Sequence, residues 1–381
     1  MRFRLVCPCL FGLERFLADE IDALGYEPDT VQDGRVIFTG DEEAVARCNI
    51  GLRTAERVLI LLGEFEARTF DQLFEGVRAL PLEDFIGRED AFPVKGSSLN
   101  SLLKSIPDCQ AIIKKAAAVR LGDHYGLPRM PETGALMQLQ FTIFKDRCSL
   151  MLDTSGQPLY KRGYRQQTNA APLRETLAAA MVMLARPVPD HLFWDPFCGS
   201  GTLPIEAAMQ MMHIAPGMKR HFAAEAYAFV PPSVWQDART EAADEVDPGK
   251  FMINASDIDP ACIQMTRCNA KAAGVDFRLR TFVSDVRQIR KTASSGVFVC
   301  NPPYGERLMD PREVKRLYTD FGNVFRQFED YRLYLLTSYR DFETDFACPA
   351  DKRRKVYNGM LRADIYQYYK HTIATKGERK L

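Results

Sequence analysis

Short stretches in which apolar and polar residues alternate are separated by longer stretches in which apolar residues recur every three or four positions. The first pattern predicts half-buried strands and the second predicts amphipathic helices. From the N-terminus the patterns predict a strand-helix-strand-helix-strand order, at 3–7, 12–21, 36–38, 42–52 and 58–65. This order indicates a small ferredoxin-like α/β domain at residues 1–60.

Residues 61–153 predict a second small α/β domain. We expect its helices at 69–80 and 109–121 and its strands at 91–94, 135–143 and 148–153. Between the first strand and the second helix we expect a polar loop, at 95–101, whose backbone N–H groups and lysine can bind phosphates. A solvated turn is the alternative. The candidate nucleic-acid contacts of this domain are Lys95, Ser97, Lys114 and Lys115.

A basic connector is expected at residues 154–168. It has the glycines and proline of a domain linker, and it also carries Lys161, Arg162, Tyr164 and Arg165. Arginine and tyrosine together can hold phosphates and stack on unpaired bases. The same residues can form a clasp between domains, and the sequence favours neither interpretation.

Residues 169–381 predict a third and larger domain in which helices alternate with strands. The expected strands lie at 192–194, 252–255, 277–282, 296–300 and 331–337, followed by an antiparallel pair at 352–357 and 359–368. This pattern is typical of a doubly wound, mostly parallel sheet. Residues 213–250 form an insertion between the first two strands.

Composition leaves the partner open but indicates the compartment. Lysine plus arginine equals aspartate plus glutamate, at 50 each, although bases outnumber acids by 11 to 5 in residues 91–165 and by 9 to 3 in residues 351–381. The ten cysteines are scattered without paired Cys-x-x-Cys sets, which indicates free thiols rather than a zinc site. The start resembles no signal peptide, and no 18 consecutive residues are apolar. We therefore expect a cytoplasmic protein.

The first strand of the third domain leads into a glycine turn with the sequence Asp-Pro-Phe-Cys-Gly-Ser-Gly-Thr, residues 195–202. Gly199 and Gly201 let the backbone adopt positive φ and approach a bound group closely. The turn lacks the Lys-Ser/Thr of a P-loop and the third glycine of a dinucleotide fingerprint. Asp195 would also repel a pyrophosphate, so the turn indicates a ligand other than a nucleotide phosphate.

Aspartates also follow the next two predicted strands. A carboxylate at the position of Asp257, after the second strand, can accept hydrogen bonds from both hydroxyls of a ribose. Asp285, after the third strand, can accept one from the exocyclic amine of adenine, and Asp195 leaves room for a cationic amino-acid tail. S-adenosylmethionine fits this set better than a nucleotide does. A single aspartate after a strand is more often a helix cap or turn former, as we expect for Asp259.

The fourth predicted strand ends in Asn301-Pro302-Pro303-Tyr304. The prolines fix the backbone and lack N–H donors, so the Asn301 side chain and a carbonyl oxygen can both accept from one substrate amine. Tyr304 offers an aromatic face. These features suit a planar amine such as that of a nucleobase, with its lone pair aimed at a sulfonium methyl. A proline-rich turn without function is the alternative.

Together, residues 195–202 and 301–307 resemble the motifs of class I S-adenosylmethionine-dependent methyltransferases that act on exocyclic amines. Residues 95–99, 153–156 and 161–165 are similar to the THUMP RNA-binding domain and its exit in ribosomal RNA large-subunit guanine-N2 methyltransferases. Residues 214–217 and 220–222 resemble the insertion of that family. The resemblance implies a Rossmann-like, seven-stranded methyltransferase domain behind ferredoxin-like and THUMP domains, and a guanine N2 of 23S ribosomal RNA as methyl acceptor.

The resemblance also assigns roles by position. Catalysis would involve Asn301, Pro302, Pro303 and Tyr304, and Arg174 and Glu175 are weaker additions. The implied cofactor-binding residues are Asp195, Phe197, Cys198, Gly199, Ser200, Gly201, Thr202, Asp257, Ile258, Asp285, Val286 and Asn301. The implied RNA contacts are Lys95, Ser97, Lys114, Lys115, Lys161, Arg162, Tyr164 and Arg165. An adenine-N6 methyltransferase of DNA or RNA, or a non-catalytic RNA-binding assembly factor, is the alternative function.

Overall fold

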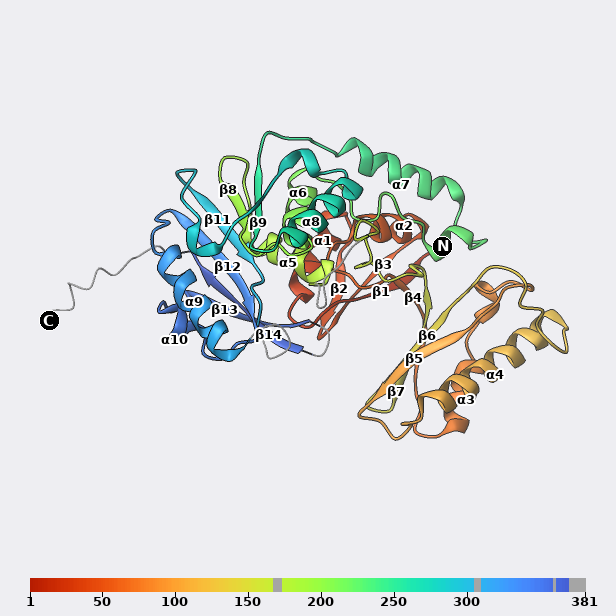
Figure 1. Ribbon diagram of the computed structural model, residues 1–381. Coiled ribbons are helices and arrows are strands. Elements are labelled where there is room, and N and C mark those ends of the chain that lie inside the picture. Colours follow the sequence, from red (N-terminus) through yellow and green to blue (C-terminus); the bar gives the residue numbers. More distant parts are fainter. Residues whose placement is uncertain (167–172, 305–309, 359–360, 370–381) are drawn as a thin grey trace. The chain divides into compact units, whose positions relative to one another are not determined.

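The computed structural model describes residues 1–166, 173–304, 310–358 and 361–369, which form two compact units (Figure 1). Unit 1 comprises residues 1–9, 18–159 and 219–241, and unit 2 comprises residues 10–17, 160–218 and 242–381. The expected start of the third domain, near Thr168, lies outside the described residues.

Unit 1 is built on one seven-stranded sheet with the strand order β2-β3-β1-β4-β7-β6-β5. Its strands are β1 (Phe3–Pro8), β2 (Pro28–Gln32), β3 (Arg35–Gly40), β4 (Leu59–Glu66), β5 (Val94–Leu99), β6 (Leu139–Phe144) and β7 (Arg147–Asp153). Strand β4 pairs antiparallel with β1 on one side and with β7 on the other. The two small domains predicted from the sequence therefore share one continuous sheet.

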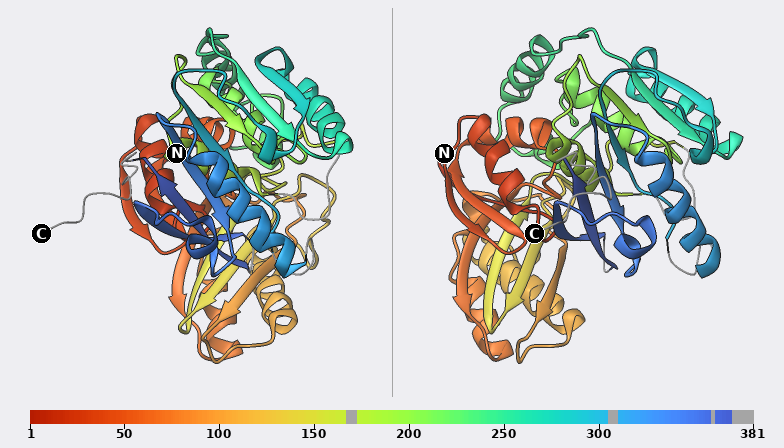
Figure 2. Two further views of the ribbon diagram at one scale, coloured as in Figure 1. Left: turned by 60° about the vertical axis from the view of Figure 1, so that its left-hand side comes forward. Right: turned by 90° about the vertical axis from the view of Figure 1, so that its left-hand side faces the viewer.

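The helices assigned to this part of the chain are α1 (Glu14–Ala23), α2 (Glu42–Gly51), α3 (Phe70–Arg78), α4 (Ile106–Tyr125) and α7 (Pro232–Asp244). Helices α3 and α4 lie side by side on one face of the β5-β6-β7 part of the sheet (Figures 1 and 2). Along β6, alternate residues are fully buried, namely Leu139, Phe141 and Ile143. The remaining β6 side chains, which point to the other face, are partly or fully exposed.

The prediction of a polar loop at residues 95–101 is wrong. Residues Val94–Leu99 form the edge strand β5, which pairs parallel with β6, and Lys95, Ser97 and Leu99 project as an exposed row. Gly96 is required here because a Cβ atom would lie 2.2 Å from the Phe141 carbonyl oxygen. An edge strand with one solvated face needs few apolar residues, so its composition is that of a loop.

Part of the insertion belongs to unit 1. The Tyr227 hydroxyl donates to the Asp153 carbonyl oxygen at 2.5 Å, and the Phe229 ring packs against Phe3 and Phe85 with centroids 5.8 and 5.5 Å apart. Residues 219–241, which follow the glycine turn in sequence, thus contribute to the core of unit 1.

Unit 2 is built on a second seven-stranded sheet with the order β10-β9-β8-β11-β12-β14-β13. Its strands are β8 (Leu192–Asp195), β9 (Ile253–Asp257), β10 (Leu279–Val283), β11 (Gly296–Cys300), β12 (Tyr331–Thr337), β13 (Lys352–Asn358) and β14 (Leu361–Tyr368), and its helices are α5 (Glu175–Ala185), α6 (Thr202–Met211), α8 (Pro260–Ala273), α9 (Pro311–Phe325) and α10 (Phe342–Phe346). Strands β10, β9, β8, β11 and β12 are parallel, and β14 is antiparallel to both neighbours. The predicted mostly parallel sheet is confirmed.

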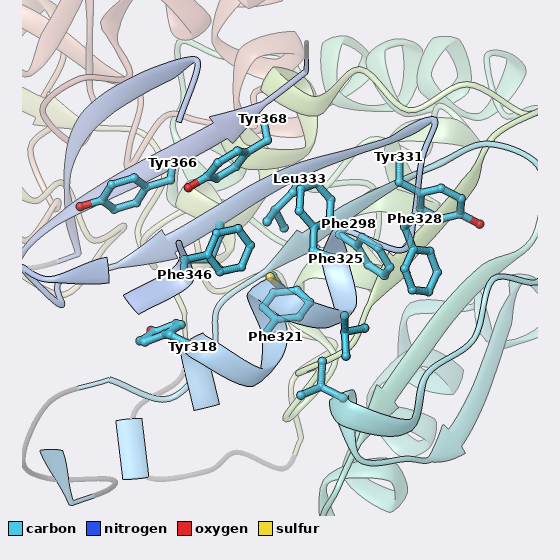
Figure 3. Close-up of a cluster of buried hydrophobic side chains, with 14 of the residues drawn as sticks. Phe298, Tyr318, Phe321, Phe325, Phe328, Tyr331, Leu333, Phe346, Tyr366 and Tyr368 are labelled. Carbon is cyan, nitrogen blue, oxygen red and sulfur yellow. The ribbon is translucent and has the colours of Figure 1, made fainter. Parts of the chain in front are cut away.

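An aromatic core fixes β11 and β12 against α9. Phe298 of β11 is fully buried, and its ring centroid lies 5.1 Å from that of Phe328 and 5.3 Å from that of Tyr331 (Figure 3). Phe321 and Phe325 of α9 point into the same cluster. Asn301 directly follows β11, so this core fixes the strand end at which the sequence Asn301-Pro302-Pro303-Tyr304 begins.

Candidate active site

Four strands end at one edge of the unit 2 sheet. The parallel neighbours β10, β9, β8 and β11 bring together the strand ends that carry Asp285, Asp257, Asp195 and Asn301. The carboxyl edge of such a sheet, where the chain order reverses from β8 to β9 and β11, is the usual ligand site. The sequence predicted that these four positions share one edge, and the topology confirms that prediction.

The glycine turn is joined to β9 by two hydrogen bonds and to α8 by a third. Cys198 N donates to the Ser256 carbonyl oxygen at 3.0 Å, Gly199 N donates to Asp257 Oδ2 at 2.9 Å, and the Thr266 hydroxyl of α8 donates to the Gly199 carbonyl oxygen at 2.9 Å. Gly201 has φ of +87°, and a Cβ there would lie 2.9 Å from the Thr266 side chain. Only glycine permits this approach. The shape of the turn is therefore fixed by contacts within the protein.

Two acids lie at this edge: Asp195 is buried, and Asp257 is partly buried. Burial raises the pKa of Asp195 well above its ordinary value, and the neighbouring charge of Asp257 raises it further. Burial also raises the pKa of Asp257. Neither carboxylate forms an ion pair within the described part of the chain. A cationic amino group close to Asp195 would stabilise its ionised form, so the donor set fits the amino-acid end of S-adenosylmethionine.

Asp285 differs from the other two acids. Its pKa is lowered because the Arg287 guanidinium donates to both carboxylate oxygens, and Arg287 N donates to Oδ1 at 3.0 Å. Asp285 also caps the short 3-10 helix Val286–Gln288. The proposed contact with adenine would share these oxygens with Arg287. Ile258, at the end of β9, is 62% exposed and offers an apolar surface at the same edge.

Asn301 carries an unsatisfied acceptor. Its Oδ1 is buried and has no hydrogen-bond partner among the residues that the structure describes. Pro302 is buried, and Pro303 and Tyr304 are partly exposed. A buried carbonyl oxygen without a donor is unfavourable by about 1–3 kcal/mol, so a ligand donor at this position is favoured. The rest of the motif, Gly305-Glu306-Arg307, lies outside the described residues.

The connector contradicts the prediction that Arg162 and Tyr164 contact RNA. Both residues are about 5% exposed or less, and both side chains meet Glu206 of α6. The Tyr164 hydroxyl donates to Glu206 Oε1 at 2.9 Å, and Arg162 Nε lies 3.5 Å from the same oxygen. Their contacts hold the connector onto α6 within unit 2, so these two residues form a clasp inside one unit and not the clasp between domains that was the alternative interpretation.

Arg165 extends this clasp to the glycine turn. Its guanidinium donates to the Leu173 carbonyl oxygen at 2.6 Å and to Thr202 Oγ1 at 2.9 Å, and it lies 3.2 Å from Glu175 Oε1. Burial raises the pKa of Glu175 to about 7. Asn269 of α8 also contacts both segments, because its Oδ1 accepts from Gln166 N at 3.0 Å and its Nδ2 donates to the Ser200 carbonyl oxygen at 2.9 Å. The partners Glu206, Asn269 and Thr266 were not predicted as site residues. A lone glutamate in the apolar run 203–209 was the signal that could have identified Glu206.

The predicted RNA contacts outside the clasp have different surroundings. Lys95, Lys115 and Lys161 are exposed, as is Ser97. Lys114 pairs with Glu132 Oε2 at 2.5 Å and lies 3.5 Å from the centroid of the Phe92 ring, so much of its charge is neutralised. Within the described residues, no His, Cys, Asp or Glu cluster could hold a metal ion, and no helix could cross a membrane.

Comparisons with known proteins cover nearly the whole chain. Residues 162–367 match the family described as RMKL-like methyltransferase domain, residues 67–153 match the THUMP domain, and residues 4–59 match the RlmL ferredoxin-like domain. A protein of Bacillus subtilis (strain 168), named "Putative RNA methyltransferase YpsC", is 40% identical over 97% of this chain and 96% of its own.

Two crystal structures are also similar. One, titled a predicted N6-adenine-specific DNA methylase from Listeria monocytogenes, is 44% identical with a TM-score of 0.91, over 97% of this chain and 96% of its own. The other, titled a putative methyltransferase complexed with SAH, is 38% identical with a TM-score of 0.92, over 97% and 98%.

Proposed function

The chain belongs to the RMKL-like methyltransferase family and uses S-adenosylmethionine, and on that premise we propose that it methylates the N2 amine of a guanine in 23S ribosomal RNA. The observation that carries the proposal is the buried, unpartnered Oδ1 of Asn301 at the end of β11. An exocyclic amine supplies the donor that this oxygen lacks. The THUMP match supports RNA, rather than a small molecule, as the carrier of that amine.

S-adenosylmethionine supplies an electrophilic methyl group on its sulfonium. In our proposal Asp195 would face its amino group, Asp257 would accept from its ribose hydroxyls, and Asp285 and Ile258 would hold the adenine. Asn301 Oδ1 and a proline carbonyl oxygen accept from the two N–H groups of the base, while Tyr304 stacks on the ring. With both N–H groups oriented in this way, the nitrogen lone pair would point along the line of methyl transfer. The C–S bond would break to leave S-adenosylhomocysteine, and the methylated nitrogen would release one of its two protons to solvent. Positioning supplies most of the catalysis.

Adenine-N6 methylation of DNA is the second candidate, because the Listeria protein is titled as an enzyme of that kind. The motif at Asn301 binds an amine and does not distinguish a guanine from an adenine. The THUMP match favours RNA over this candidate.

Methyl transfer by the purified full chain separates the two candidates. Unmodified 23S ribosomal RNA and unmethylated duplex DNA are incubated with isotopically labelled S-adenosylmethionine, and product nucleosides are identified by mass spectrometry. We expect label in N2-methylguanosine from RNA. Label in N6-methyladenine, in either nucleic acid, would contradict the proposal.

The variant Asn301→Ala tests the carrying observation. We expect at least a hundredfold slower methyl transfer, as for the loss of one essential polar contact in a transition state, with calorimetric affinity for S-adenosylmethionine nearly unchanged. Asn323→Ala, on the exposed side of α9, is the matched control and keeps full activity. Loss of cofactor affinity in Asn301→Ala would place Asn301 in the cofactor half of the site.

A further inference from the structure

An apolar patch is exposed where the loop after β5 meets the β6–β7 turn. We call it the tip, and it comprises residues 99–104 and 144–147. Leu99, Leu102 and Phe144 are 62%, 65% and 45% exposed. Leu99 and Phe144 are direct partners in the parallel β5–β6 register, so their side chains lie side by side on one face of the sheet. Large apolar side chains grouped in this way mark an interaction site.

The tip is held in one conformation. Lys145 and Asp146 have φ of +51° and +64°, as a two-residue hairpin turn between β6 and β7 requires, and Asn100 has φ of +51°. Hydrogen bonds between the two segments maintain it: Leu102 N donates to Asp146 Oδ1 at 2.7 Å, and Asp146 N donates to Ser101 Oγ at 3.1 Å. These contacts fix the loop after β5 against the β6–β7 turn, so the exposed side chains of the tip are presented by an ordered backbone.

Cations surround the apolar patch. Lys104 and Lys145 are exposed, and among the described residues neither has an ion-pair partner within 4.0 Å. Lys145 Nζ lies 5.2 Å from the centroid of the Phe144 ring. Asp146 is the nearby acid, and its Oδ1 accepts a hydrogen bond from Leu102 N. Lys95 belongs to the same exposed row of β5 as Leu99. The tip thus combines an aromatic face with unpaired positive charge.

Unpaired RNA fits this combination better than the other partners do. Bases in a duplex hide their faces, whereas unpaired bases can stack on Phe144 while their phosphates meet Lys104 and Lys145. Cores of protein interfaces are depleted in lysine, which disfavours a protein partner. Resting on the proposed RNA substrate, we propose that the tip binds unpaired nucleotides of that RNA, with Phe144 stacking on a base.

Binding of the full chain to an unstructured oligoribonucleotide, measured by fluorescence anisotropy, tests this proposal. We expect Phe144→Ala to weaken binding about tenfold, because loss of one base–aromatic stack has an effect of that order. Phe144→Tyr keeps an aromatic ring and should bind like the unaltered chain. Phe70→Ala, a 37% exposed phenylalanine of α3, is the matched control and should leave the affinity unchanged. Thermal unfolding confirms that each variant is folded.

Two further measurements fix the chemistry and the class of partner. Lys145→Ala should reduce the slope of log affinity against log salt by about 0.7, the value for one phosphate contact to a single strand. An unchanged affinity of Phe144→Ala for the oligoribonucleotide would overturn the proposal, and so would an equal loss of affinity for duplex RNA. Loss of a ribosomal-protein contact in Phe144→Ala, with RNA affinity unchanged, would assign the tip to a protein. Methylation of RNA by the unaltered chain tests the proposed function separately.

Discussion

The connector and the tip are both basic segments with an aromatic residue, yet the structure gives them opposite surroundings. In the connector, Arg162 and Tyr164 are buried and contact one carboxylate. In the tip, Phe144 and Lys145 are exposed. The connector residues hold a chain segment in place, whereas the tip residues are available to a ligand.

Isolated acids in apolar helices account for the difference. Glu206 of α6 and Glu175 of α5 are buried in helices that are otherwise mainly apolar, so each needs a partner from elsewhere in the chain. The connector supplies Arg162, Tyr164 and Arg165. The acid of the tip, Asp146, is only partly buried, and its Oδ1 already accepts from Leu102 N, so it differs from the buried Glu206 and Glu175. A basic stretch is therefore best interpreted together with the buried acids that it could neutralise.

The largest effect is expected from removing the acid of the clasp. Glu206→Ala leaves the Arg162 guanidinium buried without its carboxylate, and loss of one partner of a buried pair destabilises by about 3–5 kcal/mol. Chemical denaturation of the full chain measures the change. Glu66→Ala removes an exposed partner of Arg68 and should change the free energy of unfolding by less than about 1 kcal/mol. Equal effects of the two variants would contradict the distinction between clasp and surface.

The second effect concerns pH. Burial raises the pKa of Glu175 from 4.5 to about 7, so between these values the native state binds more protons than the unfolded state. The contribution of Glu175 to the free energy of unfolding therefore falls as pH rises from 4.5 to 7, by up to about 3 kcal/mol, and is constant above. Glu175→Gln removes this contribution, and the melting temperature should vary less over this range. A slope equal to that of the unaltered chain would contradict the burial of an ionisable group there.

The smallest effect is expected at Lys161, the exposed neighbour of Arg162. Lys161→Ala should change the free energy of unfolding by less than about 0.5 kcal/mol, as surface substitutions usually do. Arg162→Ala, one position along, should destabilise by several times as much, because it removes the guanidinium that lies 3.5 Å from the buried Glu206 carboxylate. Denaturation curves of the two variants provide the comparison, and similar destabilisation by both would show that Lys161 also belongs to the clasp.

The sequence predicted the parallel part of unit 2 well because its strands are apolar runs bounded by glycine, proline and aspartate. Asp259 caps α8 as expected, accepting from Ala261 N at 2.8 Å. The edge strands of unit 1 were harder: β2 was not predicted, and β5 was taken for a loop, since both present polar residues. The short helix α10 has too few residues for a periodic signal. The domain boundaries at 60, 153 and 168 stay predictions.

The chemistry of single residues was less accessible than the fold. Chain order and strand ends were enough to place Asp195, Asp257, Asp285 and Asn301 at one edge. The same signals do not predict which charged side chains pair with each other. The Arg287 contact to Asp285 and the Glu206 contact to Arg162 therefore came only from the structure. The cofactor and base contacts assigned to these residues stay predictions.

The central claim is that the amine held at Asn301 belongs to a guanine of 23S ribosomal RNA. Nucleoside mapping of 23S ribosomal RNA, from cells that lack this chain and from cells complemented with it, tests that claim directly. We predict that one N2-methylguanosine disappears in its absence, returns with the unaltered chain and does not return with Asn301→Ala. An unchanged 23S ribosomal RNA, or the loss of N6-methyladenine instead, would contradict the account.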